Sequence, residues 1–323
     1  NKPIHRYYVW SDKNDDGTLA NNWATGNPGF NMSKGSAKPD EYPTVPVKEG
    51  YDGACVKLTT CDTGSFGSMA KMPIAAGNLF IGKFDATQAL KDAMKATQFG
   101  VPVSFKPTRF SGYYKYKRGD VFTNRQKKVV EGKKDYGTIY AVFYDNHDEE
   151  GNSVVLYGDN VQTSPQVVAL AIVPDIDDTP EWTHFDIDFI YKKEVDAQKL
   201  KNMGYSMAIV SSSSVEGASF MGAIGSTLWV DKFRITCEKK KKKKIQQEDI
   251  EKIYKKRRQD NEKVIHHISH CPIPLCPSGT GTEVGRTAPQ LYLPGVHRLQ
   301  SGWHCPYRHA SHHPHPAQLY TTA

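Results

Sequence analysis

The chain has 323 residues and a formal net charge of +7, which is enough for one large domain or two smaller ones. The charge is uneven: 15 Lys and Arg and seven Asp and Glu lie from Glu238 onward, so residues 1–237 carry a net charge of −1. A nearly neutral segment of this kind gives no indication of a polyanion-binding surface. No stretch approaches the roughly 20 apolar residues of a membrane-spanning helix, and no transmembrane segment is expected.

Residues 1–237 alternate short apolar segments with turn residues, a pattern typical of β-strands. We expect strands at residues 54–60, 75–84, 99–107, 111–117, 138–144, 153–157, 167–173, 182–191, 205–211 and 227–237. Residues 138–144 and 153–157 flank a polar segment, which predicts a hairpin with a long loop. Residues 31–50 read as loop, and residues 86–96 are the single good helix candidate. About eight to ten strands with so little helix favour an all-β jelly roll or β-sandwich.

The sequence changes character after Cys237. Six consecutive lysines follow Glu238 at the start of residues 238–265, which we expect to form a charged helix or a linker. Residues 266–323 are rich in Pro, Gly, His and Cys without periodicity, so they cannot bury a core and are predicted to be disordered. A lysine run is also a place where a reading frame is lost, so a non-native tail is an equal alternative. The lysines attract nucleic acid without specificity, and no specific nucleic-acid partner is expected.

Three cysteines belong to residues 1–237, namely Cys55, Cys61 and Cys237. An odd number cannot form a complete disulfide framework. Two interpretations stay open for Cys55 and Cys61: a disulfide across a hairpin, or two free thiols.

Seven blocks carry a family resemblance: WATGNPGF (23–30), YPT (42–44), GACVKLTT (53–60), AAGNLFIGKF (75–84), FGVP (99–102), GYYKY (112–116) and GAIGSTLWVD (222–231). In this order they resemble the bacterial "putative carbohydrate metabolism domain". The resemblance covers residues 1–237 and implies a jelly roll similar to carbohydrate-binding modules, with glycan handling at the bacterial surface. It carries over no catalytic residue.

The resemblance also bears on localisation. Family members usually follow a lipoprotein signal and an immunoglobulin-like domain, and the sequence opens on Asn1 with neither of them. We therefore expect a trimmed or incomplete chain of an extracellular or cell-surface protein. Its expected partners are a glycan or polysaccharide and other proteins of the outer surface.

Sugar binding uses an aromatic platform, because the C–H face of a sugar stacks on a ring, together with amide or carboxylate partners for the hydroxyls. Trp182, at a loop–strand junction beside Glu181, offers both. Tyr113, Tyr114 and Tyr116 place tyrosines on both faces of one strand, so at least one is expected to line a glycan-binding face. Core packing is the alternative for each aromatic, and it is the position expected for Trp10, Trp23 and Trp229.

A glycoside hydrolase is the competing interpretation, and a structural or adhesive surface domain is a third. Hydrolysis needs two carboxylates about 5–10 Å apart. The candidates are Glu181, Asp186, Asp188 and Glu216. Asp186 and Asp188 share a strand face by spacing, which is also typical of a solvated edge.

A structural calcium is the cofactor that the sequence favours. Asp12, Asn14 and Asp16 place oxygen ligands at alternate positions before a glycine, as in the first half of a calcium loop. Trp23 stands where an EF-hand has its glutamate, so a simple acidic turn is the alternative. Asp231 is a second candidate, because jelly-roll binding modules often hold a structural calcium with an aspartate near the closing strand. Its alternative role is to bond backbone amides at a strand bulge.

Overall fold

The computed structural model describes residues 7–14, 18–89, 91–238 and 255–256. The chain divides into two units, and the first contains residues 1–238. In the second unit only Lys255 and Lys256 are described, and both are helical. The other predictions for residues 239–323 lie outside the described residues. Among the described helices, none has the length and apolar character to cross a membrane.

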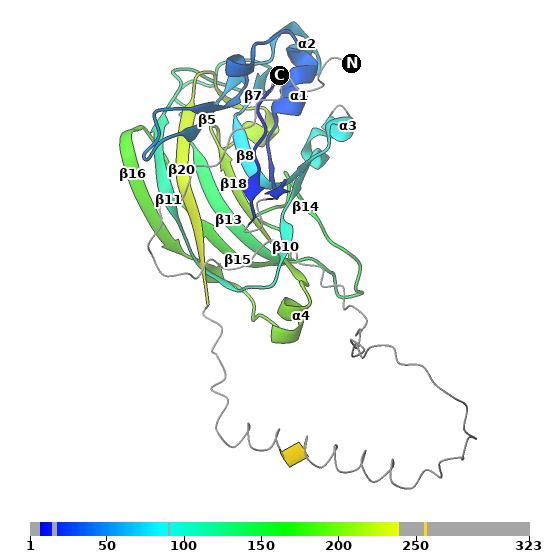
Figure 1. The fold of residues 1–323 in the computed structure, drawn as a ribbon. Coiled ribbons are helices and arrows are strands. Elements are labelled where there is room, and N and C mark those ends of the chain that lie inside the picture. Colours follow the sequence, from blue (N-terminus) through cyan, green and yellow to red (C-terminus); the bar gives the residue numbers. More distant parts are fainter. Residues whose placement is uncertain (1–6, 15–17, 90, 239–254, 257–323) are drawn as a thin grey trace, which may run out of the picture. The chain divides into compact units, whose positions relative to one another are not determined.

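Two antiparallel sheets pack as a sandwich, which confirms the predicted fold class (Figure 1). The smaller sheet has the strand order β16-β11-β20-β5-β4. Its strands are β4 (Thr44–Val47), β5 (Cys55–Thr59), β11 (Pro107–Lys117), β16 (Thr179–Asp188) and β20 (Thr227–Cys237). We call this the five-stranded sheet.

The larger sheet has nine strands, with β14-β9-β8-β18-β13-β15-β17 as its main path. Two further strands join it, β3 beside β8 and β10 beside β18. Its strands are β3 (Trp23–Ala24), β8 (Asn78–Phe84), β9 (Thr97–Phe99), β10 (Val101–Val103), β13 (Thr138–Asp145), β14 (Leu156–Tyr157), β15 (Val167–Ile172), β17 (Ile190–Tyr191) and β18 (Tyr205–Ser212). β-Branched and aromatic residues fill these strands, as expected for a buried sheet.

Short helices and two-stranded ribbons connect the sheets. The ribbons pair β1 (Asp12–Lys13) with β2 (Leu19–Ala20), β6 (Cys61–Asp62) with β7 (Ile74–Ala75), and β12 (Phe122–Thr123) with β19 (Gly222–Ala223). The helices are α1 (Asn27–Ser33), η1 (Pro39–Glu41), α2 (Gly64–Met69), α3 (Ala86–Ala89), η2 (Ala93–Lys95), α4 (Ala197–Lys201) and η3 (Gly217–Ser219).

The main core lies between the two sheets. The nine-stranded sheet contributes Ile81, Ile139 and Phe143, and the five-stranded sheet contributes Phe110 and Leu228, all of them fully buried. A second apolar cluster covers the other face of the nine-stranded sheet, with Phe80, Tyr140, Tyr144 and Val210 among its members. The nine-stranded sheet is therefore buried on both faces, which explains its nearly continuous apolar strands.

Three sequence predictions are wrong. Residues 138–144 and 153–157 do not form a hairpin, because β13 pairs with β15 and β18 while β14 pairs with β9. Residues 86–96 do contain the short helices α3 and η2, but they are not the single helical segment that was expected, because α1, α2 and α4 are helical as well. Pro28 lies in the first turn of α1, where its missing N–H is not needed, so a Gly- and Pro-rich sequence is compatible with a helix here. The segment 31–50, expected as loop, contains β4.

Candidate functional site

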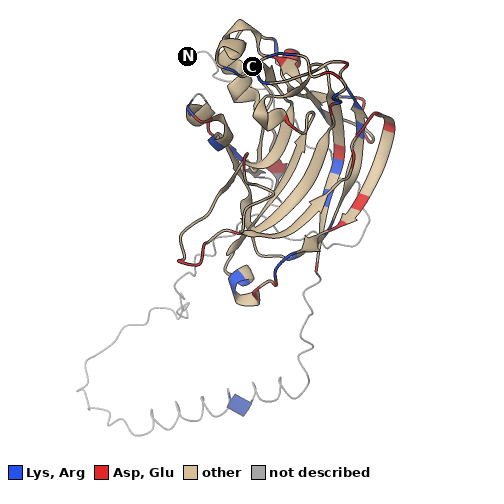
Figure 2. Cartoon of the chain, turned by 180° about the vertical axis from the view of Figure 1, so that it is seen from behind, with Lys and Arg blue, Asp and Glu red and all other residues tan. Residues whose placement is uncertain are grey.

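The outer face of the five-stranded sheet carries charged and aromatic side chains. In Figure 2, Lys, Arg, Asp and Glu mark the strands of this sheet, whereas the strands of the nine-stranded sheet are almost entirely tan. Along β11, Tyr113 and Lys115 point outward, while Tyr114 and Tyr116 belong to the core. The placement of Tyr114 and Tyr116 at a glycan site is therefore wrong: Tyr116 is 1% exposed and cannot meet a surface ligand.

Aromatic and basic side chains alternate across this outer face. Trp229 of β20 lies in register between Lys115 of β11 and Lys57 of β5. The Nζ of Lys115 lies 4.8 Å from the ring centroid of Trp229 and 5.4 Å from that of Trp182. These distances are typical of cation–π contacts, so Lys115 links the two indoles.

A second aromatic pair lies beside this row. The rings of Tyr51 and Tyr113 stack with centroids 3.6 Å apart, and Tyr51 meets Trp182 edge-on at 6.4 Å. A hydrogen bond between the two phenols raises the pKa of Tyr113. Tyr51 is 48% exposed, and Tyr113, Trp182 and Trp229 are partly exposed. We call Tyr51, Tyr113, Trp182 and Trp229 the aromatic face.

Asp231 holds the loop that carries Tyr51. Its Oδ2 accepts a hydrogen bond of 3.2 Å from the Asp52 amide, and its Oδ1 accepts one of 2.8 Å from the Lys232 amide. Lys232 has a positive φ of 54°, where the β11–β20 register shifts, and its Nζ pairs with Asp52 at 2.6 Å. The structure therefore gives Asp231 the backbone-bonding role at a bulge.

The candidate acids for hydrolysis are engaged with basic partners or stand apart. Arg109 pairs with both Asp186, at 2.9 Å, and Asp188, at 2.8 Å, on the exposed outer face. Glu216 pairs with Lys133 at 2.5 Å. Glu181 is exposed beside Trp182. Arg109 therefore engages both of the carboxylates that the sequence paired as candidate acid and base, and Glu216 is engaged by Lys133.

The acidic turn near the N-terminus is only partly described. Asp12 accepts a hydrogen bond of 3.0 Å from the indole N–H of Trp23, and Asn14 donates to Thr18 at 2.9 Å. Burial raises the pKa of Asp12. Asp16 lies outside the described residues, so calcium binding at this turn stays a prediction. Within the described ranges, no group of three or more His, Cys, Asp and Glu side chains forms a metal-binding cluster.

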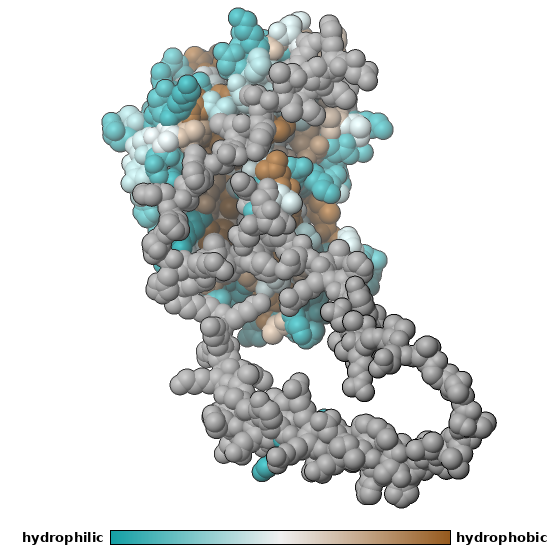
Figure 3. Space-filling view, viewed as in Figure 1, coloured by the Kyte–Doolittle hydropathy of each residue, from teal (hydrophilic) through white to brown (hydrophobic). Residues whose placement is uncertain are grey.

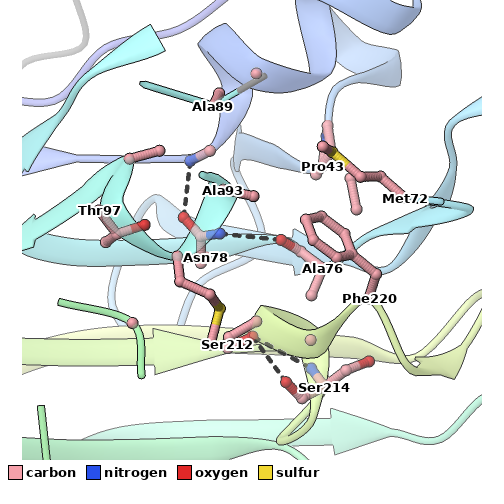
Figure 4. Close-up of a pocket in the computed structure, with 18 of the residues that line it drawn as sticks. Pro43, Met72, Ala76, Asn78, Ala89, Ala93, Thr97, Ser212, Ser214 and Phe220 are labelled. Carbon is pink, nitrogen blue, oxygen red and sulfur yellow. Dashed lines mark hydrogen bonds between the residues drawn. The ribbon is translucent and has the colours of Figure 1, made fainter. Parts of the chain in front are cut away.

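A cavity of about 430 Å³ lies against the second face of the nine-stranded sheet, away from the aromatic face (Figure 4). Its floor is two rows of side chains in register on β13, β18 and β8. One row is polar, with Thr138, Ser212 and Asn78, and the other is apolar, with Tyr140, Val210 and Phe80. Its walls come from α1, α2, α3, η2 and η3.

Sequence reasoning missed two parts of these sites. Trp229 was expected in the core, yet Leu228 and Val230 on either side of it are buried, and strand alternation alone would have turned Trp229 outward. Of the other tryptophans expected in the core, Trp10 is buried in it, and Trp23 is partly buried and packs against the core cluster. Tyr51 and the cavity depend on loops and short helices from distant parts of the sequence, for which no local signal exists.

Comparison with known proteins agrees with this fold. Residues 1–236 match the family model described as "Putative carbohydrate metabolism domain". A putative glycoside hydrolase from Bacteroides thetaiotaomicron is 42% identical, with a TM-score of 0.69, over 73% of this chain and 69% of that one. One from Bacteroides vulgatus is 38% identical, with a TM-score of 0.67, over 73% of this chain and 94% of that one. No curated protein matches the chain.

Proposed function

This chain belongs to the putative carbohydrate metabolism domain family, and on that premise we propose that it binds glycans at the aromatic face. The observation that carries the proposal is the grouping of Tyr51, Tyr113, Trp182 and Trp229 on the solvent side of a sheet. Large aromatic side chains normally bury their area in the core. Grouped at the surface, they offer ring area to a ligand with apolar C–H faces.

The polar groups around the rings supply the second requirement of a sugar site. The ammonium group of Lys115 lies over both indoles, Lys57 lies in register with Trp229, and the exposed Glu181 precedes Trp182 in β16. They provide hydrogen-bond donors and an acceptor for hydroxyl groups. Neither lysine has an ion-pair partner among the described residues. A glycan that lies across the row would therefore not have to break a salt bridge.

Glycoside hydrolysis is the second candidate, and the two similar structures described as putative glycoside hydrolases favour it. The pairing of Asp186 and Asp188 with Arg109 argues against those two as its acid and base. A structural or adhesive role would leave the aromatic face without a sugar ligand. We further propose that the protein meets this glycan outside the cell and that the natural ligand is a polysaccharide. Structural calcium is also part of the proposal.

A glycan array with the full chain, at millimolar calcium and again with chelator, tests the proposal. We expect a defined glycan to bind, and Trp182→Ala and Trp229→Ala each to weaken binding by about tenfold, or about 1.4 kcal/mol. Tyr136→Ala is the matched control, because Tyr136 is an exposed aromatic outside the aromatic face. Equal binding by all variants would overturn the assignment of the site. Release of reducing ends from the bound glycan would instead establish hydrolysis.

A further inference from the structure

The cavity on the nine-stranded sheet is a second site, and the proposed function does not use it. Its volume of about 430 Å³ is in the range of small-molecule pockets. Small residues line the cavity where the short helices approach the sheet, among them Gly29, Gly67, Ala89, Ala93 and Gly217. A Cβ added at Gly217 would lie 2.4 Å from the Cβ of Ala76, so η3 and the segment of Ala76 already pack against each other there.

The polar row of the floor has most of its hydrogen bonds committed to the protein (Figure 4). The Asn78 side chain accepts from the Gly26 amide at 2.7 Å and donates to the Ala76 carbonyl at 3.1 Å. The Ser212 hydroxyl donates to the Ser214 carbonyl at 3.0 Å and accepts from its amide at 3.4 Å. A sugar needs several free partners for its hydroxyls, and this floor offers few.

The walls and the mouth are apolar. Three methionines from different segments, Met32, Met72 and Met94, line the cavity, and methionine adapts its shape to a ligand. At the mouth, Met32 and Phe66 are 39% and 44% exposed. In Figure 3, apolar side chains are visible between the grey atoms in the middle of the face seen in Figure 1. Apolar side chains left exposed around a hollow mark a binding surface.

The charge of the lining further restricts the chemical class of the ligand. Among the described residues that line the cavity, Asp159 alone is ionisable with a charge at neutral pH. None of these described lining residues is a Lys, Arg or His that could pair with an anionic ligand. A charged ligand would lose its hydrating water on entering the cavity, and the lining would not replace most of those interactions.

From this geometry we infer that the cavity binds an uncharged, predominantly apolar group, such as an aryl or short acyl group. The group is either a free small molecule or a substituent carried by a glycan. In both cases the phenylalanine and methionine walls enclose the apolar part, and the free capacity of Thr138 and Asn78 suits a single polar atom at the floor. The site is independent of the aromatic face, which lies on the other sheet.

Titration of the full chain with N-phenyl-1-naphthylamine, an uncharged probe that fluoresces in apolar surroundings, tests the inference. We expect a saturable, blue-shifted signal with one site per chain. Ala93→Phe fills the cavity and should weaken the probe at least tenfold, while Ala197→Phe, the same change on the exposed helix α4, should not. Ala218→Phe, at an exposed wall position, is the second blocking variant if Ala93→Phe does not fold. A signal that does not saturate, or that both folded blocking variants retain, would refute the site.

Displacement of the probe separates the two sources of the group. Benzyl alcohol and benzyl glucoside both displacing the probe would indicate a free small molecule, and displacement by benzyl glucoside alone would indicate a glycan substituent. Equal displacement by methyl glucoside would overturn the apolar assignment. Trp182→Ala should leave the probe titration unchanged, so failure here and failure of glycan binding at the aromatic face are told apart.

Discussion

Lys115 and Trp229 lie opposite each other on β11 and β20, and the Lys115 Nζ lies 4.8 Å from the indole centroid. The same ammonium lies 5.4 Å from Trp182 on the other side. Lys115 therefore lies between two tryptophans that come from the strands on either side of β11. Because cation and ring alternate on the aromatic face, we expect this face to distinguish acidic sugars from neutral ones.

Lys115→Met should weaken a uronic-acid or sulfated oligosaccharide more than its neutral counterpart. Met keeps most of the apolar stem, so the loss isolates the ammonium. We expect about a fivefold to tenfold loss for the acidic glycan and little change for the neutral one, since a single exposed charge contributes about 1 kcal/mol. Calorimetry with a uronate oligomer and its carboxyl-reduced form measures the difference. Equal losses for the two glycans would mean that Lys115 acts by packing alone.

The two faces of β11 predict opposite results for neighbouring tyrosines. The buried Tyr116 hydroxyl donates to the Ser213 carbonyl at 3.0 Å, so Tyr116→Phe leaves that carbonyl short of a partner and should cost about 1–3 kcal/mol. Tyr113→Phe, on the outer face, should change the free energy of unfolding by less than about 0.5 kcal/mol. Denaturant unfolding of both variants checks this, and a larger effect of Tyr113→Phe would contradict the orientation of the strand.

This strand also shows how far sequence reasoning reaches. Alternation correctly separates Tyr113 from Tyr114 and Tyr116, because side chains of a strand alternate whatever surrounds it. Which set faces the core depends on the partner sheet, and both sets here are aromatic. Lys115 was the available signal, since a lysine seldom enters a core and Tyr113 shares its face.

Long-range pairing lay beyond the sequence for a different reason. β13 has an adjacent strand candidate in residues 153–157, yet it pairs with β15 and with β18, which starts at Tyr205. The pairing partners of a central strand are set by the packing of the whole sheet. The cavity could not be predicted for the same reason, because its floor joins β8, β13 and β18. Its walls are short helices, and their Gly and Pro residues are typical of turns.

A buried carboxylate should be essential to the stability of the loops around β19. Asp135 is fully buried, and its Oδ2 accepts hydrogen bonds from Ser214 Oγ at 2.6 Å, Ser226 Oγ at 2.8 Å and the Ala223 amide at 2.8 Å. Its Oδ1 accepts from the Tyr136 amide at 3.0 Å. An asparagine in its place must turn an N–H toward one of these backbone amides. We therefore expect Asp135→Asn to cost about 1–3 kcal/mol.

Thermal unfolding of Asp135→Asn against the exposed control Asp120→Asn measures this effect. A cost of this size lowers the melting temperature by several degrees, roughly 2–4 °C per kcal/mol for a domain of this length. Equal melting temperatures for the two variants would show that the serine hydroxyls and the loop rearrange around the amide, and that the carboxylate is dispensable.

The thiols of Cys55 and Cys61 should be slow to react in the folded chain. Both are free, and burial raises the pKa of Cys55 to about 12 and that of Cys61 to about 11. Because the thiolate is the reactive form, alkylation at pH 8 should be roughly 200-fold slower for Cys61 and roughly 2,000-fold slower for Cys55 than for an ordinary thiol of pKa about 8.5. The unfolded chain ionises first, so the raised values also make the folded state lose stability as pH rises from about 9 toward 11.

Timed iodoacetamide labelling, with mass spectrometry of the peptides that contain Cys55 and Cys61, tests this prediction. The same chain in guanidinium chloride provides the reference rate for exposed thiols. Native labelling as fast as the reference at pH 8 would contradict the burial of these thiols. Recovery of the two peptides as a disulfide-linked pair would contradict the free thiols themselves, and would restore the hairpin pairing that the sequence left open. Labelling that is slow at pH 8 and rises toward pH 11 would establish that both thiols, Cys55 in β5 and Cys61 in β6, are reduced and shielded from the reagent.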